Sequence, residues 1–278
     1  MAFFLPYLKK TICMAEKKER EYVLSNKADS FFLGIYNVWL FIKQFFIELF
    51  SPPFEGKEII RQCYNIGYRS LGLITLTGFI TGLVFTKQSR PSLAEFGATS
   101  WLPSLIAIAI IKALAPLVTA LIAAGKVGSN IGAEIGSMRV TEQIDAMEVS
   151  ATNPFKFLVV TRIVATTIVV PILAIYSGAV GMFGSYLNIS VNEHISVKAF
   201  FQGAFNSITF TDIITSMVKA TVFGFTIGVA GCFKGYYTTQ GTQGVGRSAN
   251  SAVVISMFLI FIEELVIVQI VNSFKGVG

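Results

Sequence analysis

The chain is poor in charge, in cysteine and above all in histidine. Of its 278 residues 14% are charged and 53% are hydrophobic, and the mean hydropathy is +0.66. A soluble domain of this length does not carry so much apolar surface, so the composition indicates a membrane protein. The three cysteines, Cys13, Cys63 and Cys232, are widely spaced, and His194 is the single histidine. The sequence therefore predicts neither a disulfide framework nor a metal site.

Other absences concern chemistry and targeting. The pair Gly125-Lys126 lacks a Gly five residues earlier and a Ser or Thr after it, so it is not a Walker A motif, and any ATPase must be a separate chain. No nucleophile and base stand at a plausible spacing, so we predict no catalytic residue and no cofactor. The sequence has no basic stripe with interleaved aromatic residues, so it does not indicate nucleic-acid binding. No cleavable signal is evident, because the basic cluster follows the short apolar stretch Phe3 to Leu5.

Five apolar stretches are long enough to cross a membrane, since about 20 residues span about 30 Å of hydrocarbon. They lie at roughly 60–86, 101–123, 160–188, 211–233 and 249–272. Basic residues concentrate in the N-terminal arm and in the connecting segments 124–162 and 234–248, and the positive-inside rule places these in the cytoplasm. Five crossings then put Gly278 on the outer side of the membrane. On that outer side, 190–210 is expected to form a short surface helix.

Two domains are expected. Residues 1–55 form a cytoplasmic N-terminal arm and an interfacial helix, and residues 56–278 form the membrane domain. The 31–50 stretch is strongly aromatic but contains Lys43 and Glu48, which favours a helix lying in the headgroup region with Trp39 and the phenylalanines. The alternative is a sixth spanning helix.

A polar segment, GKVGSNIGAEIGSMRVTEQIDAMEVSATNPF, separates the second and third apolar stretches. Ile131, Ile135 and Met138 share one helical stripe. We expect Thr141 to cap a second short helix, over 141–149, and Asn153-Pro154 to end it. On that helix the acidic and the apolar residues take different sides: Glu142, Asp145 and Glu148 against Ile144 and Met147. From these residues alone, a solvated amphipathic connector and a docking helix for a soluble partner remain open.

This segment resembles the signature of the MlaE-type permease family, whose pattern is close to A-G-R-x-G-S-x-x-x-A-E-x-G-x-M-R-x-T-E-Q-I-D-A-L-E followed by a Pro. The matching positions are Gly125, Gly128, Ser129, Ala133, Glu134, Gly136, Met138, Arg139, Thr141, Glu142, Gln143, Ile144, Asp145, Ala146, Glu148 and Pro154. Lys126 stands where Arg is usual. RQCYNIGYRSL at 61–71 and GYYTTQGTQGVGRSANSAVV at 235–254 are similar to two further family motifs. The resemblance covers roughly residues 55–272.

The resemblance implies a fold and a set of partners. Together with the spans and the interfacial helix predicted from the residues, the resemblance implies an all-α polytopic membrane protein with an N-terminal interfacial helix, five transmembrane helices and a cytoplasmic coupling helix, placed in the bacterial inner membrane. The partners are a second copy in a homodimer, a cytoplasmic ABC ATPase subunit, a periplasmic MCE-domain protein and phospholipid. Whether a small cytoplasmic regulatory subunit also binds is left open. The residues implied in coupling to the ATPase are Glu134, Arg139, Thr141, Glu142, Gln143, Ile144, Asp145, Met147 and Glu148.

Two features of the membrane segments concern the substrate. GFITG at 78–82 and GFTIG at 224–228 are small-xxx-small motifs, which indicate close helix packing or helices that line a cavity for acyl chains. Lys112 lies within a span, where an ionisable group costs about 2.5–3.5 kcal/mol, so it needs an anion. Relatives carry an acid where this chain has Ala113. The anion is therefore a lipid phosphate. The alternatives are that Lys112 snorkels to the membrane surface or pairs with Glu263 or Glu264 of the last span.

These features predict a lipid site. The expected residues are Phe79, Leu83, Val84, Lys112 and Leu117. The function predicted is a permease that moves phospholipids between the inner membrane and the outer envelope. The alternative is an intramembrane scaffold or enzyme without transport activity, for which the adjacent acids Glu263-Glu264 are the main support.

Overall fold

The computed structural model describes residues 32–52, 54–193, 195–239 and 241–275. The arm before residue 32 and the single histidine, both discussed above, lie outside them. The described part divides into two units, with the boundary between Phe50 and Ser51. Helices account for nearly all of it, and it contains no strand. The prediction of an all-α polytopic protein is confirmed.

Six helices are long and apolar enough to cross a membrane: Phe32–Leu49, Gly56–Glu95, Thr99–Val140, Phe155–Val191, Phe210–Tyr236 and Gly241–Ser273. The last five correspond to the five predicted spans. The first is the segment predicted to be interfacial, and by length and composition it also qualifies as a span. Its interfacial position therefore stays a prediction.

The helix α7 (Thr161–Glu193) lies at the centre of the second unit, and its span is the most buried of the six candidates. It packs against α2 (Gly56–Glu95) and against α9 (Phe210–Tyr236). The buried residues of α2 recur every fourth position, from Gln62 through Ile74 to Thr86, so one stripe of the helix faces α7.

Both small-xxx-small motifs are packing motifs. A Cβ on Gly78 would lie 3.1 Å from the carbonyl oxygen of Ser177, and one on Gly82 would overlap the backbone of Gly181. A Cβ on Gly224 would lie 2.6 Å from the carbonyl oxygen of Thr166. These glycines let α2 and α9 approach the backbone of α7 from two directions. The helix-packing interpretation is confirmed for both motifs.

The second span does not end where the apolar run ends. α3 (Leu102–Ala109), α4 (Ala115–Ala123) and α5 (Ser129–Val140) form one continuous helix, joined by the π-helical turns η2 (Ile110–Leu114) and η3 (Ala124–Gly128). The expectation of a connecting segment that starts at residue 124 is therefore wrong. Glycines disfavour helices by about 1 kcal/mol each, but here Gly132 and Gly136 lie against Ala249 and Ser248, where close packing offsets that cost.

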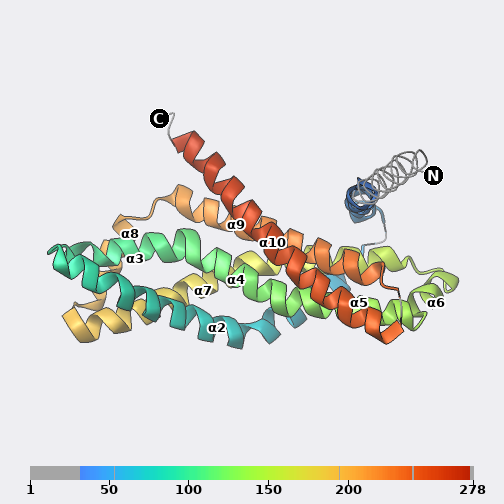
Figure 1. Cartoon of the computed structure of the whole chain (residues 1–278), viewed down its shortest axis with the longest axis horizontal. Coiled ribbons are helices and arrows are strands. Elements are labelled where there is room, and N and C mark those ends of the chain that lie inside the picture. The colour runs from blue at the N-terminus through green and yellow to red at the C-terminus, as the bar shows by residue number, and fades with distance from the viewer. Residues whose placement is uncertain (1–31, 53, 194, 240, 276–278) are drawn as a thin grey trace, which may run out of the picture. The chain divides into compact units, whose positions relative to one another are not determined.

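The remaining helices complete the unit. α8 (Val197–Asn206) confirms the short helix expected after the third span; its Phe200 and Ala204 belong to a buried apolar cluster with Leu102 and Ile106. α10 (Gly241–Lys275) packs along α5 and α9. In Figure 1, α8 lies at the left-hand end of the helix bundle and the short helix α6 (Gln143–Val149) at the right-hand end.

Candidate functional site

The helix α6 is held between two residues in the left-handed conformation. Glu142 precedes it with φ of 59°, and Ala151 follows it with φ of 58°. At its C-terminus the Ala151 amide donates to the Glu148 carbonyl and the Thr152 amide to the Met147 carbonyl, each at 3.0 Å. This is a Schellman motif, in which glycine usually occupies the left-handed position. The backbone leaves the right-handed helical conformation on both sides of α6, so α6 is a separate element.

The start of α6 differs from the prediction. Thr141 does not cap it: the Thr141 hydroxyl donates to the Ser137 carbonyl at 2.9 Å and closes the end of α5. Glu142 stands at the N-cap position without a side-chain capping bond. Asn153 does not end α6 either, because α6 already ends at Val149. Asn153 Oδ1 accepts from the Lys156 amide and so caps the π-helical turn η4 (Phe155–Val160), which leads into α7.

The faces of α6 follow the predicted pattern. Ile144 is fully buried and Met147 half-buried, whereas the polar residues Glu142, Gln143, Asp145 and Glu148 are exposed. Val149 at the end of the helix is 90% exposed. One apolar anchor thus fixes the helix and leaves a mainly acidic surface, with Val149 as its one large exposed aliphatic side chain, available for contact.

Two of the predicted coupling residues bind each other. Arg139 Nη1 lies 2.6 Å from Asp145 Oδ1, which joins the end of α5 to α6. Because both side chains are substantially exposed, the pair contributes little stability, but it neutralises one of the three acids on the helix. The excess negative charge of α6 therefore lies on Glu142 and Glu148.

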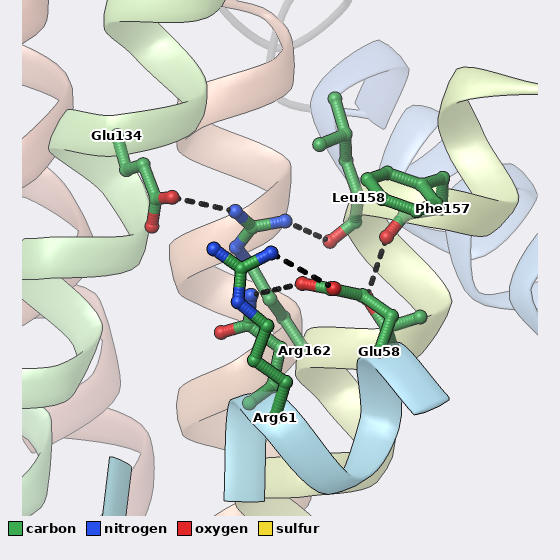
Figure 2. Close-up of polar contacts among 8 residues, drawn as sticks. Glu58, Arg61, Glu134, Phe157, Leu158 and Arg162 are labelled. Carbon is green, nitrogen blue, oxygen red and sulfur yellow. Dashed lines mark hydrogen bonds and ion pairs between the residues drawn. The ribbon is translucent and has the colours of Figure 1, made fainter. Parts of the chain in front are cut away.

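Glu134 lies apart from α6, on α5, and binds Arg162 at the start of α7. Arg162 Nη2 donates to Glu134 Oε1 at 2.8 Å, and Nη1 donates to the Leu158 carbonyl at 2.9 Å (Figure 2). The Arg162 side chain is buried and the Glu134 side chain is half exposed. Sequence reasoning treated Arg162 only as a basic residue of the connecting segment and did not identify this pair.

Lys112 has a protein partner that was not predicted. Its Nζ lies 3.5 Å from Asp212 Oδ1, so the alternative pairing with Glu263 or Glu264 is wrong. The π-helical turn η2 carries Lys112, and Asp212 belongs to the capping box that starts α9 with Thr209. The physical reason is position along the bundle: Asp212 lies in the first turn of α9, whereas the two glutamates lie far along α10.

Glu263 and Glu264 are engaged elsewhere. Lys219 Nζ lies 2.6 Å from Glu264 Oε1, and the Thr226 hydroxyl donates to Glu263 Oε1. Lys219 was missed at the sequence level, although a lysine inside the apolar run SMVKATVFGF is the signal that should have identified it.

The predicted lipid residues do not gather in one cavity. Phe79 lines an apolar groove of about 690 Å³ between α2 and α7, with Leu76, Val180 and Phe183, and Lys112 is not among its lining residues. Leu83 and Leu117 are half-buried, and Val84 is exposed on the surface of α2.

Comparison with known proteins identifies the chain. The family model described as permease MlaE matches residues 59–270. The chain belongs to the MlaE permease family. It is 36% identical over 238 residues to a probable ABC transporter permease protein of Rickettsia prowazekii, covering 86% of this chain and 91% of that one.

Relatives of this MlaE family member also come from Synechocystis and Arabidopsis thaliana. A probable ABC transporter permease protein of Synechocystis is 34% identical over 235 residues, covering 84% of this chain and 89% of that one. The chloroplastic protein TRIGALACTOSYLDIACYLGLYCEROL 1 of Arabidopsis thaliana is 32% identical over 235 residues, covering 84% of this chain and 67% of that one. The chain is thus a multi-pass membrane protein, a permease component of the ABC transporter type.

Proposed function

We propose that this permease moves phospholipids between the bacterial inner membrane and the outer envelope, as a homodimer that works with a separate ATPase chain and a periplasmic MCE-domain protein. In this proposal the N-terminus is cytoplasmic and the C-terminus periplasmic. The resemblance to the MlaE-type signature supports the partners. The glycerolipid in the name of the Arabidopsis relative supports a diacylglycerol-based lipid as the transported molecule.

The geometry of α6 is the observation that carries the proposal. A transporter without an ATP-binding motif of its own needs a rigid element through which a separate ATPase can move it. The buried anchor Ile144 and the left-handed residues Glu142 and Ala151 fix α6 at one end of the bundle. Its exposed acids give orientation and specificity to contact with basic residues of an ATPase.

Charge reversal on α6 tests this coupling role. Glu142→Lys together with Glu148→Lys leaves the Arg139–Asp145 pair and the Ile144 anchor intact, so the fold should persist. ATPase recovered by pull-down should fall several-fold at physiological ionic strength, where the Debye length is about 8 Å. Glu95→Lys is the matched control, because Glu95 is exposed at the far end of α2. Equal ATPase recovery from the double variant and the control would refute the assignment of α6.

The lipid site is tested separately through Lys112. We propose that Lys112 binds a lipid phosphate and that Phe79, Leu83, Val84 and Leu117 contact acyl chains. Lys112→Ala should lower the phospholipid that copurifies with the protein, and Lys112→Arg should retain most of it. Asp212→Asn removes the observed partner of Lys112 but keeps the lysine, so it should not lower bound lipid. If Lys112→Ala and Asp212→Asn change lipid content equally, Lys112 has a structural role only.

The alternative of a scaffold or intramembrane enzyme stays a prediction, and the contacts of its two acids support a structural role for them. The acids on which it rested, Glu263 and Glu264, bind Thr226 and Lys219 and tie α10 to α9.

A further inference from the structure

A second cavity lies at the end of the bundle that carries α6. It has a volume of about 590 Å³, within the range of small-molecule sites. The first turns of α2 form one wall, η3 and α5 form another, and η4 with the start of α7 closes it. Its lining residues do not include the lipid residues discussed above. The polar lining residues that matter here are Glu58, Arg61, Arg69, Ser70, Lys126, Glu134 and Arg162.

The charges of this cavity do not balance. It holds four basic and two acidic side chains. Glu58 accepts from Arg61 at 3.4 Å and from Gln62 at 2.8 Å, and Glu134 binds Arg162. Each carboxylate is thus already paired with one arginine.

Two cations of the cavity, Lys126 and Arg69, have no carboxylate partner among the residues that the structure describes. Lys126 Nζ donates to the backbone carbonyl of Arg69, which brings the two cations to the same wall. In the described part of the chain the Arg69 guanidinium makes no hydrogen bond or ion pair, and its side chain is exposed. The cavity therefore presents a net positive charge from Arg69 and Lys126.

Two buried donors point to a ligand independently of that charge. Ser70 is 1% exposed and Arg162 3% exposed. Neither Ser70 Oγ nor Arg162 Nε has a hydrogen-bond partner in the part of the chain that the structure describes. Both residues line the cavity. Buried polar groups are nearly always paired, and a water or a ligand acceptor bound beside these two donors would satisfy them.

Part of the cavity lining is apolar. Ile66, Val127, Ile131 and Leu158 line it together with the charged residues, and α2 becomes apolar directly after Ser70. A basic pocket between membrane helices at this boundary suits an anionic headgroup with a short apolar extension. Arg and hydroxyl donors together favour a phosphate over other anions, because its oxygens accept several charge-assisted bonds.

We propose that this cavity binds a phosphate group, carried either by an anionic phospholipid or by a free phosphate ion, through Arg69, Lys126, Ser70 and Arg162. The site goes beyond the transport function proposed above, because it lies at the α6 end of the bundle and shares no residue with the Lys112 site. Its occupant contacts both α2 and the α5 segment that leads to α6.

Titration calorimetry on the full chain in a neutral detergent tests the site. The probes are dihexanoyl phosphatidylglycerol, sodium phosphate and uncharged dihexanoylglycerol. Arg69→Gln should weaken binding of the charged lipid by roughly tenfold, the effect of one charge-assisted bond. Arg69→Lys keeps the charge and should retain most of the affinity. Lys87→Gln, which removes an exposed charge from the other end of α2, should bind as the wild type does.

The two sources separate in the same titrations. Lipid binding that millimolar phosphate does not compete away identifies a headgroup site, whereas phosphate binding that Arg69→Gln abolishes identifies a free-anion site. Dihexanoylglycerol should bind weakly and without dependence on Arg69. Charged probes that bind Arg69→Gln and the wild type equally would overturn the proposal.

Lys112→Ala keeps this proposal distinct from the transport site. The component of lipid binding that depends on Arg69 should persist in Lys112→Ala. If all lipid binding disappears in Lys112→Ala and none in Arg69→Gln, the cavity proposal fails while the Lys112 site stands. Ser70→Ala provides a second variant without charge loss, and it should weaken phosphate-group binding several-fold. Wild-type affinity in both single variants, Ser70→Ala and Arg69→Gln, would exclude the site.

Discussion

The ammonium nitrogen of Lys219 lies 2.6 Å from Glu264 Oε1, and this ion pair joins the two apolar helices α9 and α10. Lys219 is 2% exposed and Glu264 17% exposed in side-chain area. Desolvating two charges is expensive, so such a pair adds little net stability over two apolar residues. Loss of one partner, however, leaves a buried charge without its counter-ion.

A first prediction follows for this ion pair. Lys219→Met should destabilise the protein by about 3–5 kcal/mol, because Glu264 stays buried without its cation. The double variant Lys219→Met with Glu264→Leu should recover most of that loss. The thermal unfolding midpoint of the purified protein in detergent measures both effects. Equal midpoints for the single variant and the wild type would mean that Glu264 finds water or a proton instead.

A second prediction concerns the end of α6. Ala151 adopts φ of 58° in the Schellman motif, and a Cβ in this conformation costs about 1–2 kcal/mol. Ala151→Gly should therefore slow amide hydrogen exchange within α6. The matched control is Ala146→Gly inside the helix, which should speed exchange because glycine disfavours helix by about 1 kcal/mol. Faster exchange in both variants would contradict the assigned cap.

A third prediction concerns helix packing. A Cβ on Gly82 would overlap the backbone of Gly181, which has no side chain to move aside, whereas a Cβ on Gly72 of the same helix meets nothing within 4 Å. Gly82→Ala should cost about 1–3 kcal/mol through overpacking of α2 on α7. Gly72→Ala should be neutral or stabilising, because alanine favours helix. Thermal unfolding midpoints in detergent compare the two, and a Gly82→Ala midpoint at or above that of Gly72→Ala would disprove the close contact.

A fourth prediction concerns topology. Five crossings with a cytoplasmic N-terminus place residue 273 outside and residue 239 inside. In a variant without native cysteines, a thiol introduced as Ser273→Cys should react with an impermeant reagent applied to spheroplasts. Thr239→Cys should react only after lysis. Both positions are exposed in the structure. The reverse labelling pattern would show that the helix Phe32–Leu49 also crosses the membrane.

Much of the architecture was predictable because membrane burial imposes simple rules on sequence. Apolar runs of sufficient length located all five later spans. The alternation of Ile144 with exposed acids located α6 and its buried side, since a helical period separates the two faces without knowledge of the partners. The signature motif around Glu134 and Asp145 led to the MlaE permease family, which the comparisons confirm.

The caps of α6 were not predictable from residue preferences. Thr141 is a favourable N-cap residue, yet α5 continues to Val140 and uses its hydroxyl. Ala151 occupies a position where glycine is usual. In both cases the packing of α5 and the buried Ile144 fix the chain path, and the tertiary structure overrides a preference of about 1 kcal/mol.

The sequence by itself determined the membrane class, the spans, the family and the existence of α6. Only the tertiary structure decided which charges meet: Lys112 with Asp212, Arg162 with Glu134, and Lys219 with Glu264. It also decided that the glycines between 125 and 136 continue a helix, because α9 and α10 pack closely against them. The physical reason is the distance along the sequence over which each effect acts. Hydropathy and helical period act over a few neighbouring residues, whereas an ion pair or a close backbone contact depends on how helices distant in sequence are aligned.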